Sequence, residues 1–258
     1  MLKQSSKGVI QKLIMLGMAL WVTQVHADGV TDLKAALVKL QGNTPLKASI
    51  ESKSWNRQGE GKKAEEMQAT ASVNIEDSTR GLQVMYSKDL LARLQSEERA
   101  KEKDANSKMP MTTTLREFNA NELRPMVSAA NNLSHRLETA VYKQEKQDTF
   151  NGKPARLLSF DIPVEHLSAK ERKYLKTYEG KLDIWIDADG TPLASRVSET
   201  IKGSAFVVVS FEAKEDESVV YGVTGDRLVV LRKESKNLSA GAGEQNETRV
   251  IKSLQIQS

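Results

Sequence analysis

The chain has 258 residues, with 38 basic and 34 acidic residues, 39% hydrophobic and 5% aromatic residues, and no cysteine. The absence of cysteine excludes disulfides, thiol nucleophiles, zinc–thiolate sites and the lipidated cysteine that anchors a bacterial lipoprotein. The formal net charge is +4, and no segment combines a basic stripe with interleaved aromatic residues. We therefore expect no nucleic-acid partner.

Residues 1–27 have the pattern of an export signal. Three lysines precede an uncharged apolar run at 13–22, and Ala27 completes a small-residue cleavage site. As a helix the run would span roughly 15 Å, about half of a bilayer core, which favours a cleaved signal over a retained anchor. Its removal leaves 35 basic and 34 acidic residues, so residues 28–258 are expected to form a soluble periplasmic protein without an integral membrane segment.

The 231 residues after the signal are enough for one domain that buries roughly 70–75% of its unfolded surface. No linker rich in proline or glycine divides them. Apolar residues three or four apart over 30–40 predict a first helix, and Gly42 follows as a stop signal.

Three strands are predicted next, because residues 46–51, 67–76 and 82–86 alternate apolar and polar side chains. The strands share one apolar face. Alanines at the middle of that face leave space either for a closely packed helix or for a ligand. This face is our candidate ligand-binding surface, formed by Met67, Ala69, Ala71, Val73, Ile75, Leu82, Val84 and Tyr86.

Residues 88–137 return to helical spacing and are predicted to form a helical lid region. The charged run at its centre indicates a solvated helix end, and 110–116 is expected to be a loop or a short extended piece. Pro125 suits the first position of a second helix. That helix would present Met126 and Val127, which we add to the candidate ligand-binding residues.

The rest of the chain is dominated by predicted strands. Asn151 and Gly152 are a strong hairpin signal, and Ser168 and Glu171 have the spacing of a capping box. The polar stretch 235–247 is expected to be a flexible hairpin tip. The predicted strands here are 140–150, 155–162, 181–187, 192–201, 205–212, 219–223, 228–232 and 248–256.

About eleven antiparallel strands interrupted by helices predict a mainly β (α+β) fold. We expect a strongly curved sheet or an incomplete barrel whose concave face is covered by helices.

Catalytic chemistry has no signature in the sequence. His135 and His166 lie in separate segments without metal-ligand spacing, and no serine elbow or related nucleophile motif occurs. The run from Asp187 to Gly190 lacks the acidic residue that closes an EF-hand loop, and it suits a type I turn between strands. We therefore predict no catalytic residue, no metal site and no cofactor.

The layout resembles the periplasmic lipoprotein carrier family, the LolA/LolB-like fold. The resemblance is carried by Ala27-Asp28 and Asp32-Leu33-Lys34 at the first helix, by the strand, glycine turn and strand at 50–73, and by the late strands at 182–187 and 191–197. It implies an incomplete antiparallel barrel capped by helices, with an apolar cavity that holds the acyl chains of a lipoprotein.

The family also uses an arginine on the sheet to hold the closed lid. Arg80 is the matching candidate for this lid contact, although Gly81 stands where the family has a proline, and the lid region 88–137 is longer and more charged.

The resemblance implies a non-enzymatic role in lipid binding and transport, as a chaperone for outer-membrane lipoprotein localisation. The expected ligand is a lipid or lipoprotein acyl chain, with a partner protein in the inner or outer membrane. Exposing an acyl chain of roughly 16 carbons to water would cost a free energy of about 13 kcal/mol. The alternative is a protein-interaction or envelope-sensor module of the same fold whose core is filled by its own side chains.

Overall fold

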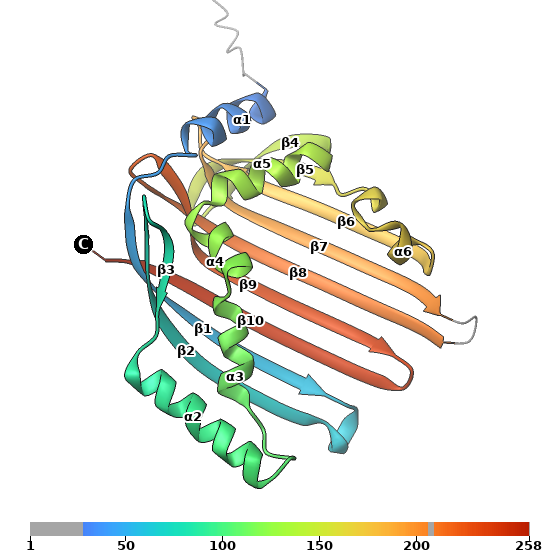
Figure 1. The fold of residues 1–258 in the computed structure, drawn as a ribbon. Helices are drawn as coiled ribbons and strands as arrows, with labels where there is room; N and C mark the ends of the chain where they lie inside the picture. Colours follow the sequence, from blue (N-terminus) through green and yellow to red (C-terminus); the bar gives the residue numbers. More distant parts are fainter. Residues whose placement is uncertain (1–27, 206–208, 258) are drawn as a thin grey trace, which may run out of the picture.

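A computed structural model describes residues 28–205 and 209–257 of the chain, so the predicted signal peptide, residues 1–27, lies outside the described residues. Within the described ranges, ten antiparallel strands form one open sheet accompanied by six α-helices (Figure 1). The prediction of a mainly β fold is confirmed. The strands lie in the order β3-β2-β1-β10-β9-β8-β7-β6-β5-β4, with β3 and β4 at the two edges.

The helices and strands have the following bounds. The strands are β1 (Leu46–Gln58), β2 (Glu65–Ser78), β3 (Gly81–Met85), β4 (Val141–Phe150), β5 (Lys153–Asp161), β6 (Leu175–Ile186), β7 (Pro192–Ala205), β8 (Val209–Thr224), β9 (Arg227–Gly241) and β10 (Glu244–Ile256). The helices are α1 (Gly29–Lys39), α2 (Lys88–Lys103), α3 (Pro110–Leu115), α4 (Ala120–Val127), α5 (Ala129–Thr139) and α6 (Ala169–Arg172), and a short 3-10 helix, η2 (Arg116–Phe118), joins α3 to α4.

The expected count of eleven strands is wrong because residues 209–212 of the predicted strand 205–212 and the whole predicted strand 219–223 lie in one continuous strand, β8. The charged residues between them interrupt the apolar alternation but not the backbone pairing with β7 and β9. The expected flexible tip at 235–247 is also wrong. β9 and β10 pair through this stretch, and only Ala242 and Gly243, both at positive φ, turn the chain.

Several local signals are confirmed. Asn151 and Gly152 both have positive φ in the two-residue turn between β4 and β5. Ser168 and Glu171 form the predicted capping box at α6. The run from Asp187 to Gly190 turns the chain between β6 and β7, where the Gly190 amide donates to the Asp187 carbonyl at 3.1 Å.

Three of the described helices, α3, α4 and α5, lie over one face of the sheet (Figure 1). Figure 1 shows α3, α4 and α5 as a band across that face, where α3 contacts β1 and β2 while α4 and α5 contact β9. We call residues 110–139, which comprise α3, η2, α4 and α5, the helical layer. The buried core lies between this layer and the sheet, whereas the opposite face carries exposed cross-strand ion pairs such as Arg196 with Asp216.

Two expectations about the helical layer are wrong. Residues 110–116, expected to be a loop or extended piece, form α3 and the start of η2, and Pro110 occupies the first turn of α3. Pro125, expected at a helix start, lies inside α4. Its missing N–H removes one backbone hydrogen bond from α4, which ends two residues later, and Ser128 separates α4 from α5.

A glutamate on α2 caps α3. The carboxylate of Glu97 accepts hydrogen bonds from the backbone amides of Met111 at 2.7 Å and Thr112 at 2.9 Å, and from the Thr112 hydroxyl at 2.9 Å. These amides belong to the first turn of α3, where no carbonyl of the helix can reach them. The cap therefore joins α2 to the helical layer and lets a six-residue helix form.

We predict that Glu97→Ala lowers the free energy of unfolding by about 1–2 kcal/mol, because it leaves helix-terminal amides without their acceptor. Urea unfolding followed by circular dichroism measures the change. Glu98→Ala is the matched control, since Glu98 is exposed on the same helix, and its effect should stay within about 0.5 kcal/mol. Equal effects of the two substitutions would contradict the capping role.

Candidate functional site

The apolar face of β2 lies against the helical layer. Ala71, Val73 and Ile75 are buried in the core, and α3 contacts this strand. Met126 and Val127 of α4 are buried in the same core. The structure therefore buries these five candidate residues in one core under helices, with α3 over β2 and α4 over β9.

The other candidate residues lie around this buried group. Met67 and Ala69 are half-buried toward the far end of β2. Leu82 and Val84 of β3 are partly buried and pack against the core. Tyr86 is 41% exposed beyond the end of β3, so the structure does not bring it onto the buried face.

Arg80 does not hold the helical layer. Its side chain is 69% exposed in the turn between β2 and β3, and its guanidinium lies 3.7 Å from the carboxylate of Glu76 on the same hairpin. The expected lid contact is wrong because the turn directs this residue into solvent.

A buried lysine makes the contact between sheet and helices instead. Lys252 of β10 is 1% exposed, and its Nζ lies 2.5 Å from Glu122 Oε2 of α4 and 2.8 Å from Glu117 Oε2 of η2. Burial acts to raise the pKa of Glu122, but the hydrogen bond and charge of Lys252 outweigh it and lower that pKa below its ordinary value. We call these three residues the lysine clasp.

A second ionic contact joins α5 to the sheet. Glu217 of β8 is buried between Arg136 of α5, at 2.9 Å, and Lys233 of β9, at 2.7 Å. Burial acts to raise the pKa of Glu217, whereas the charges of Arg136 and Lys233 act to lower it, and the net direction is downward. Lys233 pairs with Lys252 across β9 and β10, so the two ionic contacts are neighbours under the helices.

Hydroxyl groups adjoin the lysine clasp on β1. The side-chain oxygens of Ser54 and Thr114 are 2.5 Å apart, which joins β1 to α3. Ser52 is completely buried, and its hydroxyl has no hydrogen-bond partner in the part of the chain that the structure describes.

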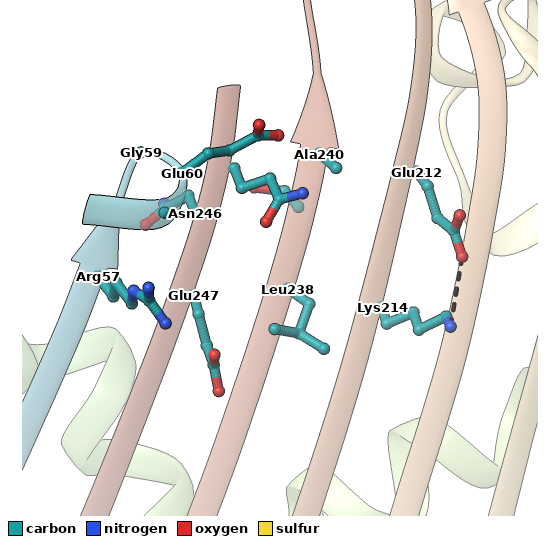
Figure 2. A pocket seen from close by; sticks show the side chains of 12 residues that line it. Arg57, Gly59, Glu60, Glu212, Lys214, Leu238, Ala240, Asn246 and Glu247 are labelled. Carbon is teal, nitrogen blue, oxygen red and sulfur yellow. Dashed lines mark ion pairs between the residues drawn. The ribbon is translucent and has the colours of Figure 1, made fainter. Parts of the chain in front are cut away.

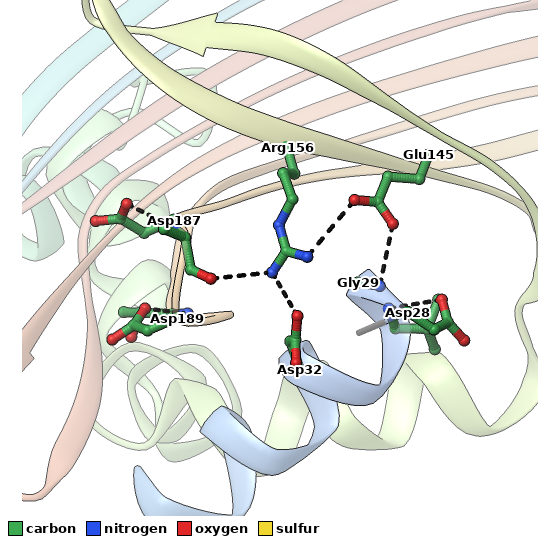
Figure 3. Close-up of polar contacts among 10 residues, drawn as sticks. Asp28, Gly29, Asp32, Glu145, Arg156, Asp187 and Asp189 are labelled. Carbon is green, nitrogen blue, oxygen red and sulfur yellow. Dashed lines mark hydrogen bonds and ion pairs between the residues drawn. The ribbon is translucent and has the colours of Figure 1, made fainter. Parts of the chain in front are cut away.

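The helix α1 is held separately. Figure 3 shows Arg156 of β5 between Asp32 of α1 and Glu145 of β4, with its Nη2 2.7 Å from Asp32 Oδ2 and its Nη1 3.6 Å from Glu145 Oε1. The carboxylate of Glu145 also accepts from the backbone amide of Gly29 at 3.0 Å. This cluster joins α1 to β4 and β5.

A cavity of about 260 Å³ opens beside the C-terminal end of α5. Its apolar floor is formed by Ile162, Leu182 and Val197. Glu199 and Glu215 line it as well, and burial, together with the charges of the neighbouring glutamates, raises the pKa of Glu215. The cavity combines apolar side chains with carboxylates, and Arg136 and His166 also line it.

A second cavity, of about 330 Å³, lies at the far end of β1, β9 and β10 (Figure 2). Its lining mixes both signs of charge, with Arg57 and Lys214 beside Glu212 and Glu247, and Glu212 lies 3.3 Å from Lys214. The cations and carboxylates alternate along the lining, so the cavity favours neither an apolar nor a singly charged ligand.

The residues of the two ionic contacts were missed by sequence reasoning. One signal was present, because Lys252 falls in phase with the buried residues Val250 and Leu254, where strand alternation places an inward-facing side chain. Its partner Glu122 is 130 positions away, and no local pattern indicates that pairing.

Over residues 28–205 and 209–257, no group of three histidine, aspartate or glutamate side chains is placed to hold a metal ion. No helix in the same ranges has the length and apolar character needed to cross a membrane. Comparisons with protein-family models, curated proteins and solved structures found no match to this chain.

The lysine clasp predicts an asymmetry between its members. Lys252→Met should change the free energy of unfolding by less than about 1.5 kcal/mol, because Glu117 and Glu122 are 27% and 38% exposed and can be hydrated. The double substitution Glu117→Gln with Glu122→Gln should cost roughly 3 kcal/mol, since it leaves a buried ammonium without a counter-charge. Urea unfolding of the native protein and the two variants at neutral pH measures both changes. A larger loss of stability in Lys252→Met than in the double variant would contradict this account.

The lowered pKa values of Glu122 and Glu217 predict an acid-sensitive fold. The unfolded chain binds more protons at these groups, so their stabilisation is present above about pH 4.3, the ordinary glutamate value, and is lost as the pH falls through the lower folded values. Unfolding free energies measured from pH 7 to pH 3 should decline over that acidic window. Glu217→Gln should be destabilised at pH 7 and should show a shallower decline, and an unchanged slope in that variant would refute the assignment.

Proposed function

We propose that this chain is a non-enzymatic periplasmic binding protein that shelters an apolar chain, from a lipid or from a lipoprotein, between its sheet and its helical layer. The observation that carries the proposal is the lysine clasp. It places a buried ionic contact at the interface between an apolar sheet face and a set of short helices.

Such an interface is suited to opening. A buried ion pair adds little net stability, because the loss of hydration roughly offsets the attraction, but it fixes geometry. Glu117 and Glu122 are partly exposed, so they can return to water when the layer moves. The apolar surfaces of Val73 and Ile75 would then be covered by the ligand instead of by helices.

The size of the cavity beside α5 supports a mechanism in which an acyl chain enters by displacing the helical layer. The cavity beside α5 measures about 260 Å³, below the roughly 300–1,000 Å³ typical of ligand sites. An acyl chain of roughly 16 carbons therefore needs the helical layer to move. The small side chain of Ala71 and the flexible side chains of Met111 and Met126 in the core suit a surface that covers either helices or a ligand.

The proposal includes the finer architecture implied by the resemblance to the lipoprotein carrier family. We infer a curved sheet whose concave face carries the helical layer as a lid, with Lys252 in the role expected of Arg80. Loading and release of a lipoprotein chain would involve a partner protein in the inner or outer membrane.

A second candidate function is an interaction or envelope-sensor module with a permanently closed core. It is favoured by the burial of Ala71, Val73 and Ile75 on β2, which α3 contacts, and of Met126 and Val127 on α4, which contacts β9. In that case the helices never leave the sheet, and the partner binds an outer surface.

A disulfide lock separates the two candidates. The chain has no native cysteine that could interfere. The side-chain oxygens of Ser54 and Thr114 are 2.5 Å apart. C–S bonds are longer than C–O bonds, so two cysteine sulfurs at these positions can approach the disulfide S–S length of about 2.05 Å. The double variant Ser54→Cys with Thr114→Cys should bind a pyrene-labelled fatty acid when reduced and lose binding at least tenfold when oxidised, because α3 is then tied to β1.

The two single-cysteine variants are the controls and should bind equally under both conditions. Equal binding by the oxidised and reduced forms of the double variant would refute the lid. Absence of binding in the reduced form and in the native protein would favour the interaction module.

A further inference from the structure

Two polar side chains adjoin each other on the sheet face under the helical layer. Ser52 of β1 lies directly opposite Lys252 of β10 in the register, which places their Cβ atoms ~4.5–5.5 Å apart. Both residues are almost completely removed from solvent, at 0% and 1% exposure. The pair forms a small polar patch of one hydroxyl and one ammonium.

The hydroxyl of Ser52 lacks a partner. Among the described residues no atom forms a hydrogen bond with its Oγ, although buried hydroxyl groups are ordinarily paired. The closed arrangement therefore leaves an unused donor and acceptor at the centre of the interface. An unpaired buried group of this kind indicates a position where a further polar atom can bind.

Within the described part of the chain, both ion-pair partners of the Lys252 ammonium come from the helices. Glu117 and Glu122 both belong to the helical layer, so separation of the layer removes both carboxylates at once. Lys233 and Glu217 lie on the sheet and stay in place. The exposed patch would then hold two cations and one carboxylate, one net positive charge, beside the apolar side chain of Ala71.

We propose that the sheltered ligand is an amphiphile with an anionic head group, a carboxylate or a phosphate, that replaces Glu117 and Glu122 on Lys252 and accepts a hydrogen bond from Ser52. This inference rests on the proposed function and names the ligand class of the same site. The head group exchanges one ionic contact for another, so the buried ammonium never lies without a counter-charge. The apolar chain then extends from the patch along Ala71 and Val73.

The test compares amphiphiles of equal chain length below their micellar concentrations. Dodecanoate, dodecyl phosphate, dodecanol and dodecyltrimethylammonium are titrated calorimetrically into the exported protein. We expect dodecanoate or dodecyl phosphate to bind at least tenfold more tightly than dodecanol, and the cationic amphiphile to bind more weakly than dodecanol. The carboxylate and phosphate arms distinguish a fatty acid from a phospholipid-like head.

The variants test the named residues through one ratio, the affinity for the anionic amphiphiles divided by the affinity for dodecanol. A purely structural role would not change this ratio. Lys252→Met should reduce the ratio to about one, and Ser52→Ala should reduce it by about three- to tenfold. Glu117→Gln with Glu122→Gln should raise it, because the ligand no longer competes with those carboxylates. Lys53→Met is the control, since Lys53 is exposed on the opposite face of β1.

Each outcome has one meaning. Dodecanol binding as tightly as the anions would overturn the head-group inference and leave the proposed function standing. A ratio that is unchanged in a folded Lys252→Met or Ser52→Ala protein would overturn the assignment of those residues. No binding of any amphiphile would overturn the proposed function itself.

Discussion

A buried ammonium needs carboxylates beside it, and this requirement fixes how the helices of this protein meet its sheet. Lys252 enters the interface from β10, and Glu117 and Glu122 come from the helices to neutralise it. The neighbouring contact has the opposite polarity, because the buried carboxylate of Glu217 lies between Arg136 of α5 and Lys233 of the adjoining strand β9. Apolar residues such as Val73 and Leu158 fill the core on either side.

These ionic contacts fix the position of the helical layer on the sheet but add little to the free energy of folding. The hydration lost by buried charges nearly offsets their attraction, so apolar packing supplies most of the free energy that holds the helical layer down. In the proposed function, a ligand that offers comparable apolar surface would replace that packing. Under that proposal, the ionic contacts that position the closed layer would add little to the free energy of opening it.

Much of the fold could be predicted from the sequence because local physics determines it. Strict alternation along β2, the Asn151-Gly152 turn and the Ser168 capping box each depend on neighbours within a few residues. Where long-range contacts stabilise a segment, prediction failed. β8 continues through charged residues because its neighbours pair with it, and α3 forms because Glu97 of another helix caps it.

The candidate site was predicted in part for the same reason. Alternation identified the apolar face that includes Ala71, Val73 and Ile75, and it failed only at Tyr86, which lies beyond the end of β3. It could not show what covers them, since the covering helices follow from contacts between segments far apart. Arg80 was chosen by analogy, whereas Lys252 is identified only when its two carboxylates are seen above it.

Native-state hydrogen exchange tests the central claim most directly, because it measures opening without a ligand. If the helical layer separates from the sheet as a unit, the amides of residues 110–139 exchange through an opening that costs less free energy than global unfolding, while those of β8, β9 and β10 exchange only on global unfolding. Exchange of the helical and sheet amides at one common free energy, equal to that of global unfolding, would contradict the account.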